Sequence, residues 1–164
     1  MIRAAIPSLV LICVSFLTGC GFSPVYGSGA NSGPIQITQI EGRTGHFLRQ
    51  ELIRTVGQGI PGVASGSRLE ITLNESIDRL AFSPDQAASR SDYRGAATYA
   101  LRDANGALLA SGGVSEAASF NFADAAYADV AAQTAAQERL AALLARTIRD
   151  QLIVETGKER PPAP

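Results

Sequence analysis

The 164-residue chain contains a single histidine, His46, two cysteines and no tryptophan. A transition-metal site built from His and Cys needs more ligands than this. A Ser-His-Asp triad would have to use His46, and the Gly-x-Ser-x-Gly turn of one large hydrolase class is absent. No Gly-x-x-x-x-Gly-Lys loop is present, and no Gly-x-Gly-x-x-Gly run follows a predicted strand. We therefore expect no catalytic activity, no cofactor and no metal site, and interpret His46 as a surface residue near the start of a helix.

The N-terminus has the pattern of a secretory signal. One positive charge, Arg3, precedes an apolar run from Ile6 to Leu17. A charged start, an apolar stretch of roughly 7–15 residues and a small-residue cleavage site are typical of a signal peptide, whereas a membrane span needs about 20 apolar residues. The run ends in Leu-Thr-Gly-Cys, which resembles the lipobox of bacterial lipoproteins. We predict that residues 1–19 are removed and that Cys20 is lipidated; an ordinary signal peptide that contains a cysteine is the alternative.

This processing would leave the mature chain without a free thiol. Cys13 would be discarded and Cys20 would be consumed by lipid, so the domain would fold on its hydrophobic core alone in an oxidising compartment. Without Arg3, 13 basic and 15 acidic residues remain, a net charge of −2. This balance does not indicate nucleic acid as a partner. The remaining length predicts one domain.

Hydrophobic periodicity predicts four strands and two helices after a short tether. Residues 20–33, which include a Gly/Ser/Asn-rich stretch, are typical of a flexible lipid-anchored tether. Alternation indicates strands, and apolar residues recurring every three or four positions indicate helices. The predicted elements are a strand at 34–41, a helix at 44–57 capped by Thr44, a strand from 68 to 82, a loop at 83–92, a strand at 93–101, a strand at 107–122, and a helix at 125–155 capped by Asp124 and ended by Gly157.

This β-α-β-β-β-α order predicts an α+β fold. Both helices have one apolar face and three strands are amphipathic, so the economical arrangement is a two-layer sandwich with two helices on one face of a four-stranded, mostly antiparallel sheet. We expect a bulge near Glu75–Asp78, where the apolar alternation of the second strand becomes irregular. The domain would span 34–156, followed by a disordered Pro-rich tail at 157–164.

Four arginines stand out around the second and third strands. Arg79, Arg90, Arg94 and Arg102 lie in or near the connection and the third strand. Arg94 and Arg102 have the same parity, so we expect them to share a face opposite the apolar residues of that strand. The guanidinium group suits phosphate. These arginines could therefore bind an anionic lipid headgroup; a solvated strand face is the simpler interpretation.

Two motifs at the ends of the mature chain resemble those of a known family. The segment Cys-Gly-Phe-Ser-Pro-Val-Tyr-Gly at 20–27 is similar, with Val25 in place of Leu, to the mature N-terminus of the LptE family of lipopolysaccharide-assembly lipoproteins. Ser119-Phe120-Asn121 resembles the Ser-Tyr-Asn entry to the family's last helix. The resemblance covers the mature chain, although only its two ends carry specific motifs.

The resemblance implies a non-catalytic outer-membrane lipoprotein on the periplasmic side. Family members sit as a plug in the lumen of the LptD β-barrel and help to assemble lipopolysaccharide in the outer leaflet, binding it through basic residues. The expected partners are thus an LptD-like barrel, lipopolysaccharide and, through Cys20, the membrane. Two alternatives are a free-standing periplasm-facing lipoprotein that binds an envelope ligand and a lipid-anchored hydrolase.

Overall fold

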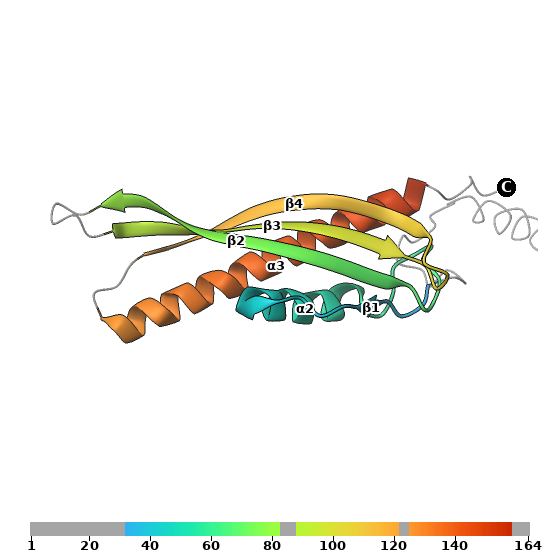
Figure 1. Cartoon of the computed structure of the whole chain (residues 1–164), viewed down its shortest axis with the longest axis horizontal. Helices are drawn as coiled ribbons and strands as arrows, with labels where there is room; N and C mark the ends of the chain where they lie inside the picture. The colour runs from blue at the N-terminus through green and yellow to red at the C-terminus, as the bar shows by residue number, and fades with distance from the viewer. Residues whose placement is uncertain (1–31, 83–87, 122–124, 159–164) are drawn as a thin grey trace, which may run out of the picture.

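The computed structural model describes residues 32–82, 88–121 and 125–158, and shows two helices and a four-stranded sheet (Figure 1). This confirms the predicted α+β class and element order. The predicted signal peptide, Cys20, most of the tether, and the last six residues lie outside the described residues. The elements are β1 (Gln36–Ile37), α2 (Gly42–Val56), β2 (Arg68–Phe82), β3 (Ala88–Arg102), β4 (Leu108–Asn121) and α3 (Ala126–Lys158).

The sheet is mixed and has the order β1-β2-β3-β4. β1 pairs in parallel with the first two residues of β2, whereas β2, β3 and β4 form an antiparallel meander with long ladders. The bulge predicted near Glu75–Asp78 is misplaced, because the β2–β3 register is continuous through Asp78 and shifts only between Arg79 and Phe82. The reason is that Ile77 still has the parity of the earlier core residues, so the apolar phase changes only after it.

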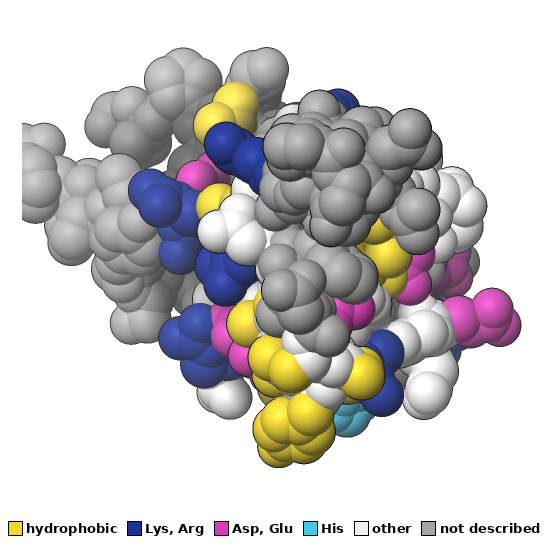
Figure 2. All heavy atoms as spheres, turned by 90° about the vertical axis from the view of Figure 1, so that its left-hand side faces the viewer, with side chains coloured by type: hydrophobic (Ala, Val, Ile, Leu, Met, Phe, Trp, Pro, Cys, Tyr) yellow, Lys and Arg dark blue, Asp and Glu magenta, His cyan; other side chains and the backbone are white. Residues whose placement is uncertain are grey.

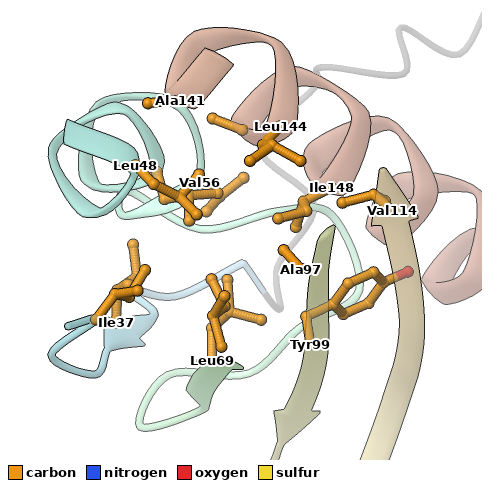
Figure 3. Close-up of a cluster of buried hydrophobic side chains, with 14 of the residues drawn as sticks. Ile37, Leu48, Val56, Leu69, Ala97, Tyr99, Val114, Ala141, Leu144 and Ile148 are labelled. Carbon is orange, nitrogen blue, oxygen red and sulfur yellow. The ribbon is translucent and has the colours of Figure 1, made fainter. Parts of the chain in front are cut away.

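Both helices pack on one face of the sheet (Figures 1 and 3). Strand alternation decides which face this is: Tyr93, Ala97, Tyr99 and Leu101 of β3 are buried, while the residues between them lie on the outer face. α3 packs tightly against β3 at Gly95, where an added Cβ would lie 3.0 Å from Leu140. The glycine therefore lets a leucine-bearing helix approach the sheet backbone.

α2 begins two residues earlier than its predicted cap. Its N-cap residue is Glu41, which makes no side-chain capping bond, and Gly42 follows at φ +80°. Thr44, predicted as the cap, is completely buried inside the helix. Glycine tolerates the left-handed conformation needed where the chain turns from β1 into the helix, and this backbone requirement outweighs the capping preference of threonine.

β3 and α3 are longer than predicted, whereas β1 and β4 are shorter and β2 has the predicted bounds. β3 begins at Ala88 rather than at Tyr93, so the predicted loop loses five residues to the sheet. Those residues are mostly polar, so hydrophobic alternation did not indicate a strand there, but they pair with both neighbouring strands. α3 continues through Gly157 to Lys158. The predicted cap of α3, Asp124, lies outside the described residues.

α2 covers only part of the sheet, which divides the domain into two halves (Figure 1). In the proximal half, β1, α2 and the C-terminal part of α3 enclose an aliphatic core. The distal half comprises residues 75–82 of β2, 88–95 of β3, 117–121 of β4 and 126–137 of α3, beyond the start of α2. Fully buried residues of the proximal half include Leu48, Leu52, Val56, Leu69, Leu101, Leu144, Ile148 and Leu152 (Figure 3).

Candidate functional site

Two of the four predicted arginines are already held by acidic neighbours. Arg94 lies on the outer face of β3, with its Nε 2.7 Å from Oδ2 of Asp78 and a second guanidinium nitrogen 3.6 Å from Asp92. Arg102, on the same face as predicted, has its Nε 3.5 Å from Glu70 and donates a hydrogen bond to the carbonyl of Gly106. Local carboxylates thus largely neutralise these two cations.

The other two predicted arginines lie toward the distal end. Arg79 is opposite Ser91 in the β2–β3 ladder, and its side chain lies outside the described residues. Arg90 is exposed and donates a hydrogen bond of 3.4 Å to the hydroxyl of Ser119. Within the described part of the chain, Arg90 has no ion pair, so its charge is available to a ligand more than those of the arginines nearer the centre of β3.

Arg90 shares a surface hollow with an arginine from the other layer. The hollow has a volume of about 410 Å³ and lies between the distal ends of β3 and β4 and the side of α3. Arg139 of α3 reaches over the edge of β4 and donates a hydrogen bond of 3.0 Å to the carbonyl of Ser119. Both guanidinium groups therefore converge on Ser119. The residues that line the hollow are Arg90, Ser119, Phe120, Asn121, Ala132, Ala135 and Arg139.

Sequence reasoning missed Arg139. Its charge sits on a helix more than 40 residues from Arg90, and helical periodicity identifies only that it is exposed. The pairing depends on β4 being the edge strand and on where α3 crosses it, and neither is visible in the local pattern. The resemblance of Ser119-Phe120-Asn121 to a family motif was the one available signal, because Ser119 is the residue that both arginines contact.

A second hollow along β4 has the opposite charge. It has a volume of about 580 Å³ and lies beside the proximal half of α3, where it is lined by Asp150, which pairs with Arg149, and by Glu155, which has no salt bridge among the described residues. Nearby, Tyr99 donates a hydrogen bond of 2.9 Å to Gln151, and burial, together with the charge of Glu155, raises the pKa of the Tyr99 phenol. Carboxylates repel anions, so of these two hollows only the distal one suits a phosphate.

The described residues contain no group of three or more His, Cys, Asp or Glu side chains placed to hold a metal ion. His46 is exposed on α2, and its ring makes an edge-to-face contact with Phe47 at 6.0 Å between centroids. This agrees with the predicted position of His46 at a helix start. Over the same described ranges, no helix has the length and apolar character that crossing a membrane requires.

Several solved structures resemble this fold. A lipoprotein from Caulobacter crescentus CB15 is 32% identical with a TM-score of 0.62, and the match covers 76% of this chain and 92% of that one. Rare lipoprotein B from Shewanella oneidensis matches at 11% identity and TM-score 0.56, over 79% and 100% of the two chains. Lipoprotein B from Nitrosomonas europaea matches at 18% identity and TM-score 0.56, over 77% and 85%. The last two likenesses concern the fold alone.

The sequence itself also identifies the family. The chain has no match among curated proteins. The model of the LptE family, described as lipopolysaccharide-assembly, matches residues 32–152, which is most of the chain and includes the four described strands, α2 and most of α3. Together with the Caulobacter lipoprotein, this match shows that the chain belongs to the LptE family of lipopolysaccharide-assembly proteins.

Proposed function

We propose that this protein is a non-catalytic outer-membrane lipoprotein, anchored through Cys20, that forms the plug of an LptD-like barrel and binds lipopolysaccharide. The observation that carries the binding proposal is the distal hollow in which Arg90 and Arg139 converge on Ser119. Neither arginine forms a salt bridge among the described residues, and the nearby Asp92 carboxylate accepts a hydrogen bond of 2.6 Å from Ser119. Lipopolysaccharide carries phosphate groups, and guanidinium groups are their preferred protein partners. Family membership supports the role in lipopolysaccharide assembly.

The outer face of the sheet supports the plug proposal. Between residues 70 and 78 of β2, 90 and 100 of β3 and 111 and 121 of β4, the described outward side chains are polar or small; Thr72, Asn74, Ala96, Thr98, Ser115 and Ala117 are examples. A polar barrel interior suits such a face. The lipid at Cys20 would add membrane affinity through its buried methylene groups, and tether residues 20–31 would connect it to the proximal end, where the described chain begins.

The arginine hollow can be tested by a matched pair of double variants. Arg90→Ala with Arg139→Ala should reduce the lipopolysaccharide that co-purifies with the protein roughly tenfold, because each exposed arginine–phosphate pair contributes up to about 1 kcal/mol and a tenfold change corresponds to about 1.4 kcal/mol. Arg94→Ala with Arg102→Ala removes the same charge but from ion-paired positions, and should change binding far less. Equal losses in both double variants would mean that general charge, and not this hollow, holds the lipid.

The plug proposal is tested by recovering the tagged lipoprotein from outer membranes in detergent. A large barrel protein at about one-to-one stoichiometry is the expected companion. Recovery of abundant, folded lipoprotein without a barrel would favour the free-standing alternative, in which the domain binds an envelope ligand alone. The arginine test remains informative in either case, because it measures lipid and not barrel.

A further inference from the structure

The distal half exposes large apolar side chains. Ile77 of β2 and Val130 and Tyr127 of α3 are 47%, 57% and 88% exposed. Figure 2 views the molecule from this end and shows hydrophobic side chains gathered along its lower side. Apolar residues exposed together at one end are a mark of an interaction site.

Val130 and Tyr127 extend the face of α3 that packs against α2. Thr134 lies on that face, because it accepts a hydrogen bond from Arg43 near the start of α2. Val130 and Tyr127 lie four and seven residues before Thr134, and residues at these spacings share one side of a helix. α2 begins only at Gly42. The same side of α3 therefore continues past the end of its helical partner with its apolar residues uncovered.

The edge of β2 is also open in the distal half. At the proximal end, the carbonyl of Leu69 points outward and accepts a hydrogen bond from the backbone N–H of Thr38. Backbone direction alternates with period two along a strand, so Glu75 and Ile77 point their N–H and C=O groups the same way. No backbone hydrogen bond among the described residues satisfies these outward groups of Glu75 and Ile77.

We propose that this distal docking surface (Glu75 and Ile77 of β2 with Val130 and Tyr127 of α3) takes an extended polypeptide segment of the barrel partner, added as a strand beside β2. The inference rests on the proposed function. It continues two contacts already present in the fold, the pairing of β1 with β2 and the packing of α2 on α3. β-Strand addition is a common way to bind an extended peptide.

The open backbone edge selects a polypeptide over a lipid. An added strand supplies carbonyls and N–H groups at the spacing that β2 needs, whereas an acyl chain would cover Ile77 but leave these polar groups unpaired. Alternate side chains of the added strand would lie beside Ile77 and over the apolar side of α3. The others would join the polar outer face. The segment should therefore alternate apolar and polar residues.

A pair of valines on α3 provides the first test. Val130 is 57% and Val154 is 56% exposed, and they lie at opposite ends of the same helix. Val130→Asp should reduce the amount of barrel recovered with the tagged full-length lipoprotein roughly tenfold, because it places a charge in a surface from which the docked segment would exclude water. Val154→Asp should leave recovery unchanged. Equal recovery with both variants would overturn the inference.

A backbone variant tests strand addition directly. Glu75→Pro removes one outward N–H, and proline is tolerated on an edge strand when that N–H faces away from the sheet. It should lower barrel recovery, whereas Glu75→Thr, which keeps the N–H, should not. Hydrogen exchange of the Ile77 amide should also slow on barrel binding. Should Glu75→Pro fail to fold, the Val130 pair and the exchange measurement decide alone.

The remaining outcomes separate the two proposals. If the wild type recovers a barrel and both Val130→Asp and Glu75→Pro do so equally well, the plug proposal stands and the docking surface is wrong. If the wild type recovers no barrel, both fail. Val130→Asp that loses lipopolysaccharide but keeps the barrel would assign the surface to acyl chains, and self-association through β2 would assign it to a second copy; either result overturns the inference.

Discussion

The proximal and distal halves of this domain use different means to hold α3 against the same sheet. In the proximal half the contact is aliphatic: Leu144 and Ile148 of α3 are completely buried with Leu48 of α2. In the distal half, where α2 is missing, Gln137 donates a hydrogen bond of 2.8 Å to the hydroxyl of Tyr93. Arg139, two residues further along α3, donates a hydrogen bond to the carbonyl of Ser119 at the distal end of β4. The proximal half therefore provides stability, and the distal half leaves polar and apolar groups available for partners.

The largest expected effect tests whether stability resides in the proximal half. Leu144→Ala should lower the free energy of unfolding by about 2–5 kcal/mol, because it removes a fully buried side chain and leaves a cavity. Leu143→Ala, one residue away but 41% exposed, should cost far less. Denaturant unfolding of both variants measures the difference. Similar losses at both positions would contradict the assignment of the core to this face of α3.

Two neighbouring glycines of β4 test how tightly the proximal half is packed. A Cβ on Gly112 would lie 2.6 Å from the hydroxyl oxygen of Tyr99, whereas one on Gly113 would meet nothing closer than 3.9 Å. Tyr99 is anchored by Gln151 and cannot easily move aside. We expect Gly112→Ala to destabilise by about 1–3 kcal/mol and Gly113→Ala to be nearly neutral. Thermal unfolding measures both, and a neutral Gly112→Ala would mean that the proximal core is looser than described.

The smallest expected effect concerns the hydrogen bond of the distal half. Tyr93→Phe leaves Gln137 without its acceptor and should cost about 1 kcal/mol. Tyr127→Phe, at a hydroxyl that is exposed on the same half, should cost nothing measurable. A loss at Tyr93 as large as that for Leu144→Ala would erase the distinction between the two halves. Chemical denaturation at fixed protein concentration gives both values.

Sequence reasoning predicted the elements and the faces better than it predicted the site. The parity of β3 placed Arg94 and Arg102 on the face opposite Tyr99, as observed. Parity cannot show, however, that Asp78 and Glu70 of the neighbouring strand neutralise these cations. That depends on the β2–β3 register, which local patterns leave open.

Arg139, the part of the candidate site that sequence reasoning missed, reaches it only through the tertiary fold. Arg139 meets Arg90 only because α3 crosses at the free edge of β4, which sets residues of two layers around Ser119. The start of α2 was predicted two residues late, because the positive φ at Gly42 belongs to the connection from β1, whose geometry a local pattern does not give. Errors of this kind come from contacts between segments distant in sequence, where propensity and periodicity carry no information.

The length of α3 sets a scale for the whole molecule. A helix of 33 residues measures about 50 Å at a rise of 1.5 Å per residue, while the hydrocarbon layer of a membrane is about 30 Å thick. A domain of this length standing along the axis of a barrel would project beyond the membrane by about 20 Å. Because the described chain begins at the proximal end, the length of the domain, together with that of the tether, would also set how far the distal hollow can lie from a lipid at Cys20.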